Sequence, residues 1–158
     1  MLKSISMQLH KLIFALLIVF AAALIGSYAT FPSIPTWYAT LNKPFFNPPN
    51  WIFGPVWTVL YLMMALSLYL IWKQNADNKD AISWFGFQLL LNSVWSIAFF
   101  GFQSPSCGLG IIILLWLAIL ITIIKFYKLS KPAAWLLIPY LLWVSFASIL
   151  NLSIVLIN

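Results

Sequence analysis

The chain alternates between long apolar runs and short polar breaks. The five runs that can be membrane spans are residues 12–31, 51–72, 81–102, 107–126 and 135–157. A helix needs about 20 mainly apolar residues to cross a hydrocarbon core about 30 Å thick. Backbone groups in lipid must be hydrogen-bonded within the protein, and no run alternates apolar and polar residues as barrel strands do. The pattern therefore predicts an all-α membrane protein, a bundle of five transmembrane helices in one domain that covers residues 1–158.

The composition agrees with this membrane class. Of the 158 residues, 64% are hydrophobic and only 6% are charged, whereas a soluble domain has about 25% charged residues. Such a chain has too little polar surface to stay in solution. The first run is also longer than the apolar core of a signal peptide, which has about 7 to 15 residues. We therefore expect the first run to be retained as a span.

The lysines predict the orientation of the chain. All eight basic residues are Lys, and five spans place seven of them on the side of the N-terminus and only Lys43 on the other side. Because Lys-rich loops face the cytoplasm, we expect a multi-pass protein of the bacterial cytoplasmic membrane with the N-terminus inside and the C-terminus outside. The lysines form no basic face, so the expected partner is the lipid bilayer, with no nucleic acid.

Ionisable and metal-binding side chains are scarce. No acidic or basic residue lies well inside a run, which disfavours an ion-coupled carrier and acid–base hydrolysis. His10 is the only histidine and precedes the first run, and Cys107 is the only cysteine. We therefore predict no metal site, no haem ligation by histidine and no disulfide.

Some polar residues inside the runs fall on common helix faces. Gln88, Asn92 and Ser96 are four residues apart, and Ser148 and Asn151 are three apart, so each set shares one face. Polar faces in a membrane point toward other helices or toward a cavity. They can serve as hydrogen bonds between helices or as orienting contacts of a ligand pocket, and the sequence leaves both interpretations open.

Prolines and aromatic residues crowd the start of the second run. Residues 41–61 read LNKPFFNPPNWIFGPVWTVLY. Proline has no backbone N–H and is tolerated at a helix start, so Pro48 and Pro49 predict an N-terminal boundary. Pro55 removes a further backbone hydrogen bond and can kink or widen the helix. A structural boundary and a ring-lined ligand entrance explain this segment equally well.

Residues 41–61 resemble the signature of the TspO/MBR family, the tryptophan-rich sensory proteins, whose animal members are called translocator protein or peripheral benzodiazepine receptor. TWYATL (36–41), FQLLLNSVWSIAFFG (87–101) and WLLIPYLLWVSFASILN (135–151) resemble further family motifs in the same order. The resemblance implies a five-helix bundle, commonly a homodimer, with a pocket that opens toward the first loop. The dimer rests on this resemblance alone, because the small-residue pair Ala22 and Gly26 is too common a pattern to support one.

The resemblance also implies a ligand and a set of site residues. It predicts a tetrapyrrole-binding sensor or scavenger whose Trp-lined pocket also accepts benzodiazepine-type or isoquinoline ligands. The expected ligand is protoporphyrin IX or a related tetrapyrrole, and no cofactor is required. The residues expected to bind the ligand are Phe46, Trp51, Trp57, Tyr61, Asn92, Trp95, Trp143 and Ala147. Phe46 stands where many members have Trp and has no indole N–H.

Two other functions stay open. By resemblance, Trp57 and Trp143 match the tryptophans that take part in light-dependent porphyrin breakdown in some family members. They are therefore candidate catalytic residues of a photo-oxidative porphyrin-degrading enzyme. A transporter or carrier of porphyrins or apolar lipids is the third possibility. Lys43 would either meet a porphyrin carboxylate or lie solvated among lipid headgroups.

Overall fold

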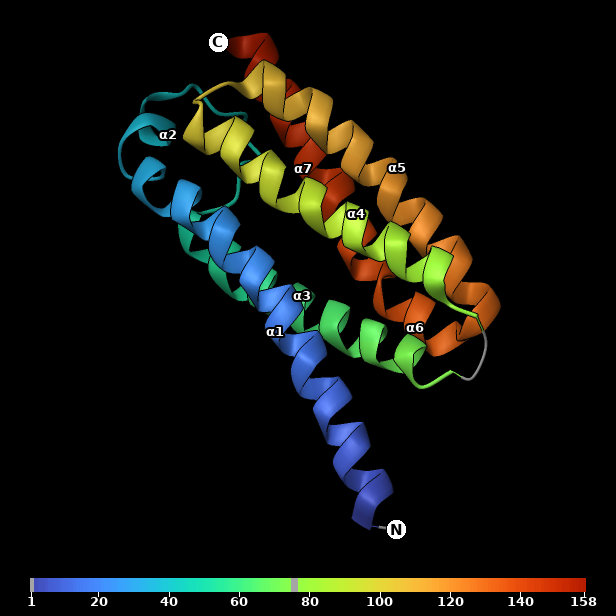
Figure 1. Ribbon diagram of the computed structural model, residues 1–158. Helices are drawn as coiled ribbons and strands as arrows, with labels where there is room; N and C mark the ends of the chain where they lie inside the picture. The colour runs from blue at the N-terminus through green and yellow to red at the C-terminus, as the bar shows by residue number, and fades with distance from the viewer. Residues whose placement is uncertain (1, 75–76) are drawn as a thin grey trace.

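Five long helices pack side by side in the computed structural model, which describes residues 2–74 and 77–158 (Figure 1). The helices and the one π-helix, η1, are α1 (Leu2–Ser33), α2 (Trp37–Thr40), α3 (Asn50–Trp72), α4 (Lys79–Ser96), η1 (Ile97–Gly101), α5 (Pro105–Leu129), α6 (Lys131–Leu136) and α7 (Ile138–Ile157). The parts long and apolar enough to cross a membrane are Gln8–Ser33, Asn50–Trp72, Lys79–Gly101, Pro105–Leu129 and Lys131–Ile157. The predicted fold class is therefore confirmed, and the helices extend a few residues beyond most of the predicted runs.

The long proline-rich connection, residues 34–49, lies at the same end of the bundle as the end of α7 (Figure 1). The backbone N–H of Asn42 donates to Oδ1 of Asn158 over 2.9 Å, and Nδ2 of Asn158 donates to the carbonyl of Asn42 over 3.0 Å. This pair fastens the connection to the last helix. We call this end of the bundle the loop end.

The start of α3 lies where its prolines predict. The helix begins at Asn50, directly after Pro49, and the backbone N–H of Ile52 donates to the carbonyl of Pro49 over 3.0 Å. The helix continues through Pro55 to Trp72. Pro55 is the sixth residue of the helix and has no N–H to donate to the carbonyl of Trp51, so one intrahelical hydrogen bond is missing there.

The fifth predicted run is divided into α6 and α7. The break lies at Leu137, just before Pro139, which cannot donate the backbone hydrogen bond that a continuous helix requires. The N–H of Leu137 instead donates to the carbonyl of Ala134 over 3.0 Å, and the hydroxyl of Ser67 donates to the carbonyl of Ala133 over 2.7 Å. The Ser67 side chain of α3 thus donates the hydrogen bond that the carbonyl of Ala133 lacks at the break.

The last turn of the third span widens into the π-helix η1. The N–H of Phe102 donates to the carbonyl of Ile97, five residues back, over 2.8 Å. Ser33, the last residue of α1, donates its hydroxyl to the carbonyl of Phe100 over 3.0 Å. The apolar pattern did not predict this π-helix. Such π-helical turns are often found at functional sites.

Small residues bring α1 and α4 into close contact. A Cβ added to Gly26 would lie 3.1 Å from Oγ of Ser96, and the hydroxyl of Ser93 donates to the carbonyl of Ala22 over 3.0 Å. The small pair Ala22 and Gly26 therefore serves packing within the chain. Because α1 is held against α4 and η1, its loop-end half has a fixed position beside the cavity described next.

Candidate ligand-binding site

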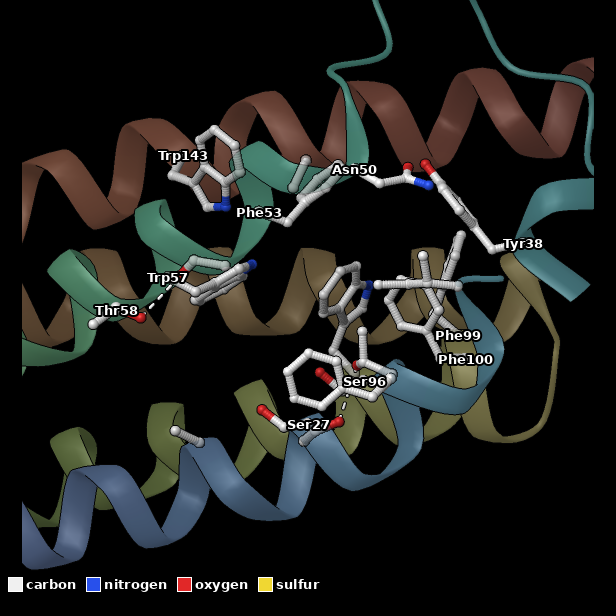
Figure 2. Close-up of a pocket in the computed structure, with 18 of the residues that line it drawn as sticks. Ser27, Tyr38, Asn50, Phe53, Trp57, Thr58, Ser96, Phe99, Phe100 and Trp143 are labelled. Carbon is white, nitrogen blue, oxygen red and sulfur yellow. Dashed lines mark hydrogen bonds between the residues drawn. The ribbon is translucent and has the colours of Figure 1, made fainter. Parts of the chain in front are cut away.

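A cavity of about 470 Å³ lies at the loop end, between α1, α3, α7 and the end of the α4–η1 span. Figure 2 shows side chains from these elements pointing into one space, with Tyr38 of α2 at the loop side. This volume lies within the range of roughly 300–1,000 Å³ that is typical of small-molecule sites. A second groove, of about 820 Å³, lies on another side of α1, and its wall residues Tyr28 and Phe102 are 87% and 76% exposed. The second groove is thus a surface depression.

Six of the eight predicted binding residues line the cavity. They are Trp51, Trp57, Tyr61, Trp95, Trp143 and Ala147. Figure 2 shows Trp57 on α3 and Trp143 on α7, two helices far apart in sequence, turned toward the same space. The two candidate catalytic tryptophans are therefore brought together.

Phe46 and Asn92 do not line the cavity. The ring of Phe46 packs against that of Phe146 on α7, with ring centroids 6.3 Å apart. Asn92 is buried behind the wall, where its Oδ1 accepts from the hydroxyl of Tyr61 over 2.7 Å and its Nδ2 donates to the hydroxyl of Tyr140 over 3.1 Å. Asn92 therefore joins α4 to α3 and α7 and supports the wall through Tyr61.

Aromatic neighbours hold both tryptophans in place. Trp57 stacks on Tyr61 with ring centroids 5.4 Å apart, and its ring meets Tyr140 edge-on at 6.2 Å. Trp143 meets Phe53 of α3 edge-on at 6.0 Å. Such offset and edge-to-face arrangements are the favoured geometries of aromatic pairs. The cavity therefore has ring walls whose orientation is set by packing.

The indole N–H groups of Trp57 and Trp143 are unused. The Trp95 Nε1 donates to Oδ1 of Asn151 over 3.3 Å and the Trp116 Nε1 donates to the hydroxyl of Ser145 over 2.8 Å. Among the described residues, no acceptor binds the N–H of Trp57 or Trp143. Both side chains are half-buried at the cavity wall, so these two neutral donors are available to a ligand.

The cavity has polar groups but no charge. Its described lining includes hydroxyls from Ser27 and Thr30 of α1 and Thr58 of α3, and the amides of Asn50 and Asn151, with no Asp, Glu, Lys, Arg or His. Within the described residues, no three His, Cys, Asp or Glu side chains gather as a metal site. The site is therefore suited to an apolar molecule with a few hydrogen-bond acceptors.

The inward polar face of α4 serves both of the uses that the sequence left open. Gln88, Asn92 and Ser96 are 1%, 1% and 9% exposed. Asn92 joins neighbouring helices, whereas Ser96 lines the cavity. The amide of Gln88 is buried with no hydrogen-bond partner in the described structure.

Lys43 does not reach the cavity. Its Nζ donates to the carbonyls of Leu41 and Ala39 over 3.0 and 3.4 Å and lies 4.9 Å from the centre of the Tyr38 ring. Tyr38 is buried and donates its hydroxyl to Oδ1 of Asn47 over 2.8 Å, and burial raises the pKa of Tyr38 to about 12. Lys43 thus stabilises the connection that covers the cavity, and the geometry does not favour contact with a ligand carboxylate.

Sequence reasoning missed several wall residues. Phe99 and Phe100 reach the cavity from the π-helix, and Ser27 reaches it from α1 (Figure 2). Thr30 of α1 also lines the cavity. The widened turn had no signal in the apolar pattern. The first run is otherwise apolar around the helix, and Ser27 and Thr30, three residues apart on one face, were the only signal of the side that meets the cavity.

The sequence of the chain matches a known protein family along most of its length. The sequence profile of the TspO/MBR family matches residues 14–157. The chain is 47% identical to the tryptophan-rich protein TspO of Archaeoglobus fulgidus over 153 residues, which cover 96% of this chain and 99% of that protein. It is 34% identical to the tryptophan-rich sensory protein of Cereibacter sphaeroides, over 77% of each chain. It is also 40% identical to the human translocator protein, over 73% of this chain and 70% of that one. The chain is therefore a multi-pass integral membrane protein that belongs to the TspO/MBR family.

Proposed function

We propose that the cavity binds a tetrapyrrole such as protoporphyrin IX and that the protein acts as a sensor or scavenger of such molecules. The observation that carries this proposal is the pair of unused indole N–H groups of Trp57 and Trp143 on facing walls of an uncharged cavity. A flat macrocycle suits ring-lined walls, and its polar edge groups can accept from the two donors.

Burial of apolar ligand surface would give a modest affinity. Burial of roughly 200 Å² of ligand surface at about 25 cal/mol per Å² contributes about 5 kcal/mol before the costs of association are subtracted. The same walls would accept benzodiazepine-type or isoquinoline ligands, which are also flat and largely apolar. The proposal includes the bacterial cytoplasmic membrane, an inside N-terminus and an outside loop end, and a homodimer.

A photo-oxidative porphyrin-degrading enzyme is the second candidate. The ring of Trp57 lies 6.5 Å from that of Trp95 and 5.4 Å from that of Tyr61. An excited porphyrin in the cavity would therefore lie beside several rings that can exchange electrons with it. This chemistry requires no acid–base pair, in agreement with the uncharged lining. Transport of porphyrins or apolar lipids is the third candidate.

Titration of purified protein with protoporphyrin IX tests the binding proposal. Saturable quenching of tryptophan fluorescence, weakened in Trp57→Phe and Trp143→Phe, supports it. Trp84→Phe is the matched control because Trp84 lies on α4 outside the cavity lining. Absence of saturable binding would overturn the proposal.

Illumination and uptake assays separate the three candidates. Loss of the porphyrin Soret band with a defined new product, abolished in both cavity variants, would favour the enzyme. Retained porphyrin with quenched fluorescence would favour the sensor or scavenger. Porphyrin uptake into proteoliposomes above that of empty vesicles would favour the transporter.

A further inference from the structure

The cavity wall is open on one side, between α1 and α3. Leu24 and Phe31 of α1 line the cavity, yet each is 70% exposed on the surface of the bundle. Gly54 and Thr58 of α3 also line the cavity and are exposed. A residue that belongs to both an inner wall and the outer surface lies at the rim of an opening. These four residues therefore form the rim of a side opening, which we call the α1–α3 opening.

The packing of α1 explains why this side is open. In its loop-end half, α1 is joined to α4 and η1 through Ser93 and Ser33, whose hydroxyls donate to the carbonyls of Ala22 and Phe100. The side-chain contacts of α1 with α3 lie deeper in the bundle; they include Phe20–Tyr61, Phe14–Trp72 and Lys11–Trp72. Near the rim, no atom lies within 4 Å of a Cβ placed on Gly54.

The α1–α3 opening lies at the depth of lipid acyl chains. Thr58 lies eight residues from the start of α3 at Asn50, and Leu24 lies nine residues from the end of α1 at Ser33. At 1.5 Å per residue, the opening reaches about 12 to 14 Å from the helix ends. Half of a hydrocarbon core is about 15 Å thick. The deep part of the rim therefore meets hydrocarbon, and apolar Leu24 and Phe31 suit that contact.

The route from water is covered at the loop end. The connection over the cavity is fastened by the reciprocal hydrogen bonds of Asn42 with Asn158 and by the hydrogen bond of Tyr38 to Asn47. Lys43 adds two donations to carbonyls of the same connection. A molecule can enter through the side opening without breaking any of these hydrogen bonds.

We propose that ligands enter and leave the cavity sideways through the α1–α3 opening, from the bilayer leaflet at the loop end. The site then selects molecules that are already dissolved in the membrane, which are flat, largely apolar molecules with a few acceptor groups. The porphyrin arm of the test below rests on the proposed function, whereas the route itself does not depend on which molecule binds.

Gly54→Trp tests the route because it places a ring at the rim of the opening, and a Cβ added to Gly54 meets no atom within 4 Å. Gly110→Trp is the matched control. Gly110 is an exposed glycine in the loop-end part of α5, and a Cβ placed on it also has no atom within 4 Å. Leu24→Ala should widen the opening, because it shortens an exposed rim side chain.

The first measurement uses a small aryl diazirine that partitions into the bilayer. Protein in nanodiscs is mixed with this probe and irradiated by short flashes at increasing delays after mixing. The rate at which adducts appear on Trp57 and Ala147, two cavity-wall residues, is measured by mass spectrometry. We expect Gly54→Trp to slow this labelling rate at least fivefold and Gly110→Trp to leave it unchanged. Equal labelling rates in wild type and Gly54→Trp would overturn the proposed route.

The second measurement uses protoporphyrin IX loaded into the nanodisc lipid. We expect Gly54→Trp to slow both association and dissociation at least tenfold, and Leu24→Ala to speed both. Rates that do not respond to either variant would contradict the sideways route. If wild type binds no porphyrin, the proposed function fails, while the diazirine measurement still decides the route.

Discussion

The ring of Trp57 lies stacked on the ring of Tyr61, with centroids 5.4 Å apart and planes inclined by 28°. Tyr61 is in turn fixed by its hydroxyl, which donates to the buried amide of Asn92. A hydrogen bond behind the wall therefore sets the position of an indole at the wall, although Asn92 itself does not line the cavity.

Asn92→Ala should lower both stability and affinity for porphyrin. The substitution leaves the hydroxyls of Tyr61 and Tyr140 without their amide partner, and an unsatisfied buried polar group costs about 1–3 kcal/mol. We expect a lower thermal unfolding midpoint in detergent and a weaker Kd, because Trp57 loses the support of Tyr61. Tyr61→Phe removes one hydroxyl but keeps the stacked ring, so it should lose less affinity. Equal affinities of Asn92→Ala and wild type would contradict this indirect role.

Trp143→Phe and Trp143→Ala should weaken porphyrin binding to different degrees. Phenylalanine keeps a ring but removes the N–H, and a net hydrogen bond contributes about 0.5–1.5 kcal/mol, so Kd should rise by roughly 2- to 13-fold. Alanine also removes the ring contact with Phe53 and should raise Kd further. Fluorescence titration measures both. Identical Kd values for the two variants would show that the N–H alone matters, and no change in either would remove Trp143 from the site.

Tyr38 should make the covering connection less stable at high pH. Burial raises the pKa of Tyr38 from 10.0 to about 12. Since the exposed phenol loses its proton near pH 10 and the buried one near pH 12, the stabilisation is complete below pH 10 and is lost as the pH rises toward 12. The thermal midpoint of wild type minus that of Tyr38→Phe should therefore fall between pH 9.5 and about 11.5. A constant difference over this range would contradict the buried, hydrogen-bonded state of Tyr38.

Gln88→Leu should stabilise the protein. The buried amide of Gln88 has no hydrogen-bond partner in the described structure, and replacement of an unsatisfied polar group by an apolar one of similar size removes a cost of about 1–3 kcal/mol. The thermal midpoint should rise while the Kd for porphyrin stays unchanged, since Gln88 does not line the cavity. A lower midpoint would show that the amide has a partner that stabilises the fold.

The apolar pattern was sufficient to predict the spans because lipid requires about 20 apolar residues and full backbone hydrogen bonding. It did not predict the break at Leu137 or the π-helix at Ile97–Gly101. Both depend on where individual backbone groups find partners, such as the hydroxyl of Ser67 at the carbonyl of Ala133.

The cavity was predictable in part. Family motifs pointed to Trp57 and Trp143, which the bundle brings to one space. Asn92 was predicted to contact the ligand, but its amide lies behind Tyr61, because the position of a polar residue on an inward face does not show which layer of the bundle it occupies. No sequence pattern marked Gly54 as a rim residue, because whether a residue lies at the edge of a cavity depends on how two helices pack against each other.

Trp57 and Trp143 both line the cavity, and a ligand bound there should contact both indoles. Fluorine NMR of protein labelled with 5-fluorotryptophan measures this, with each resonance assigned by single Trp→Phe variants. On titration with protoporphyrin IX, we expect the Trp57 and Trp143 resonances to shift together with one Kd while the Trp84 resonance stays in place. Shifts at only one of the two tryptophans, or equal shifts at Trp84, would contradict a shared cavity.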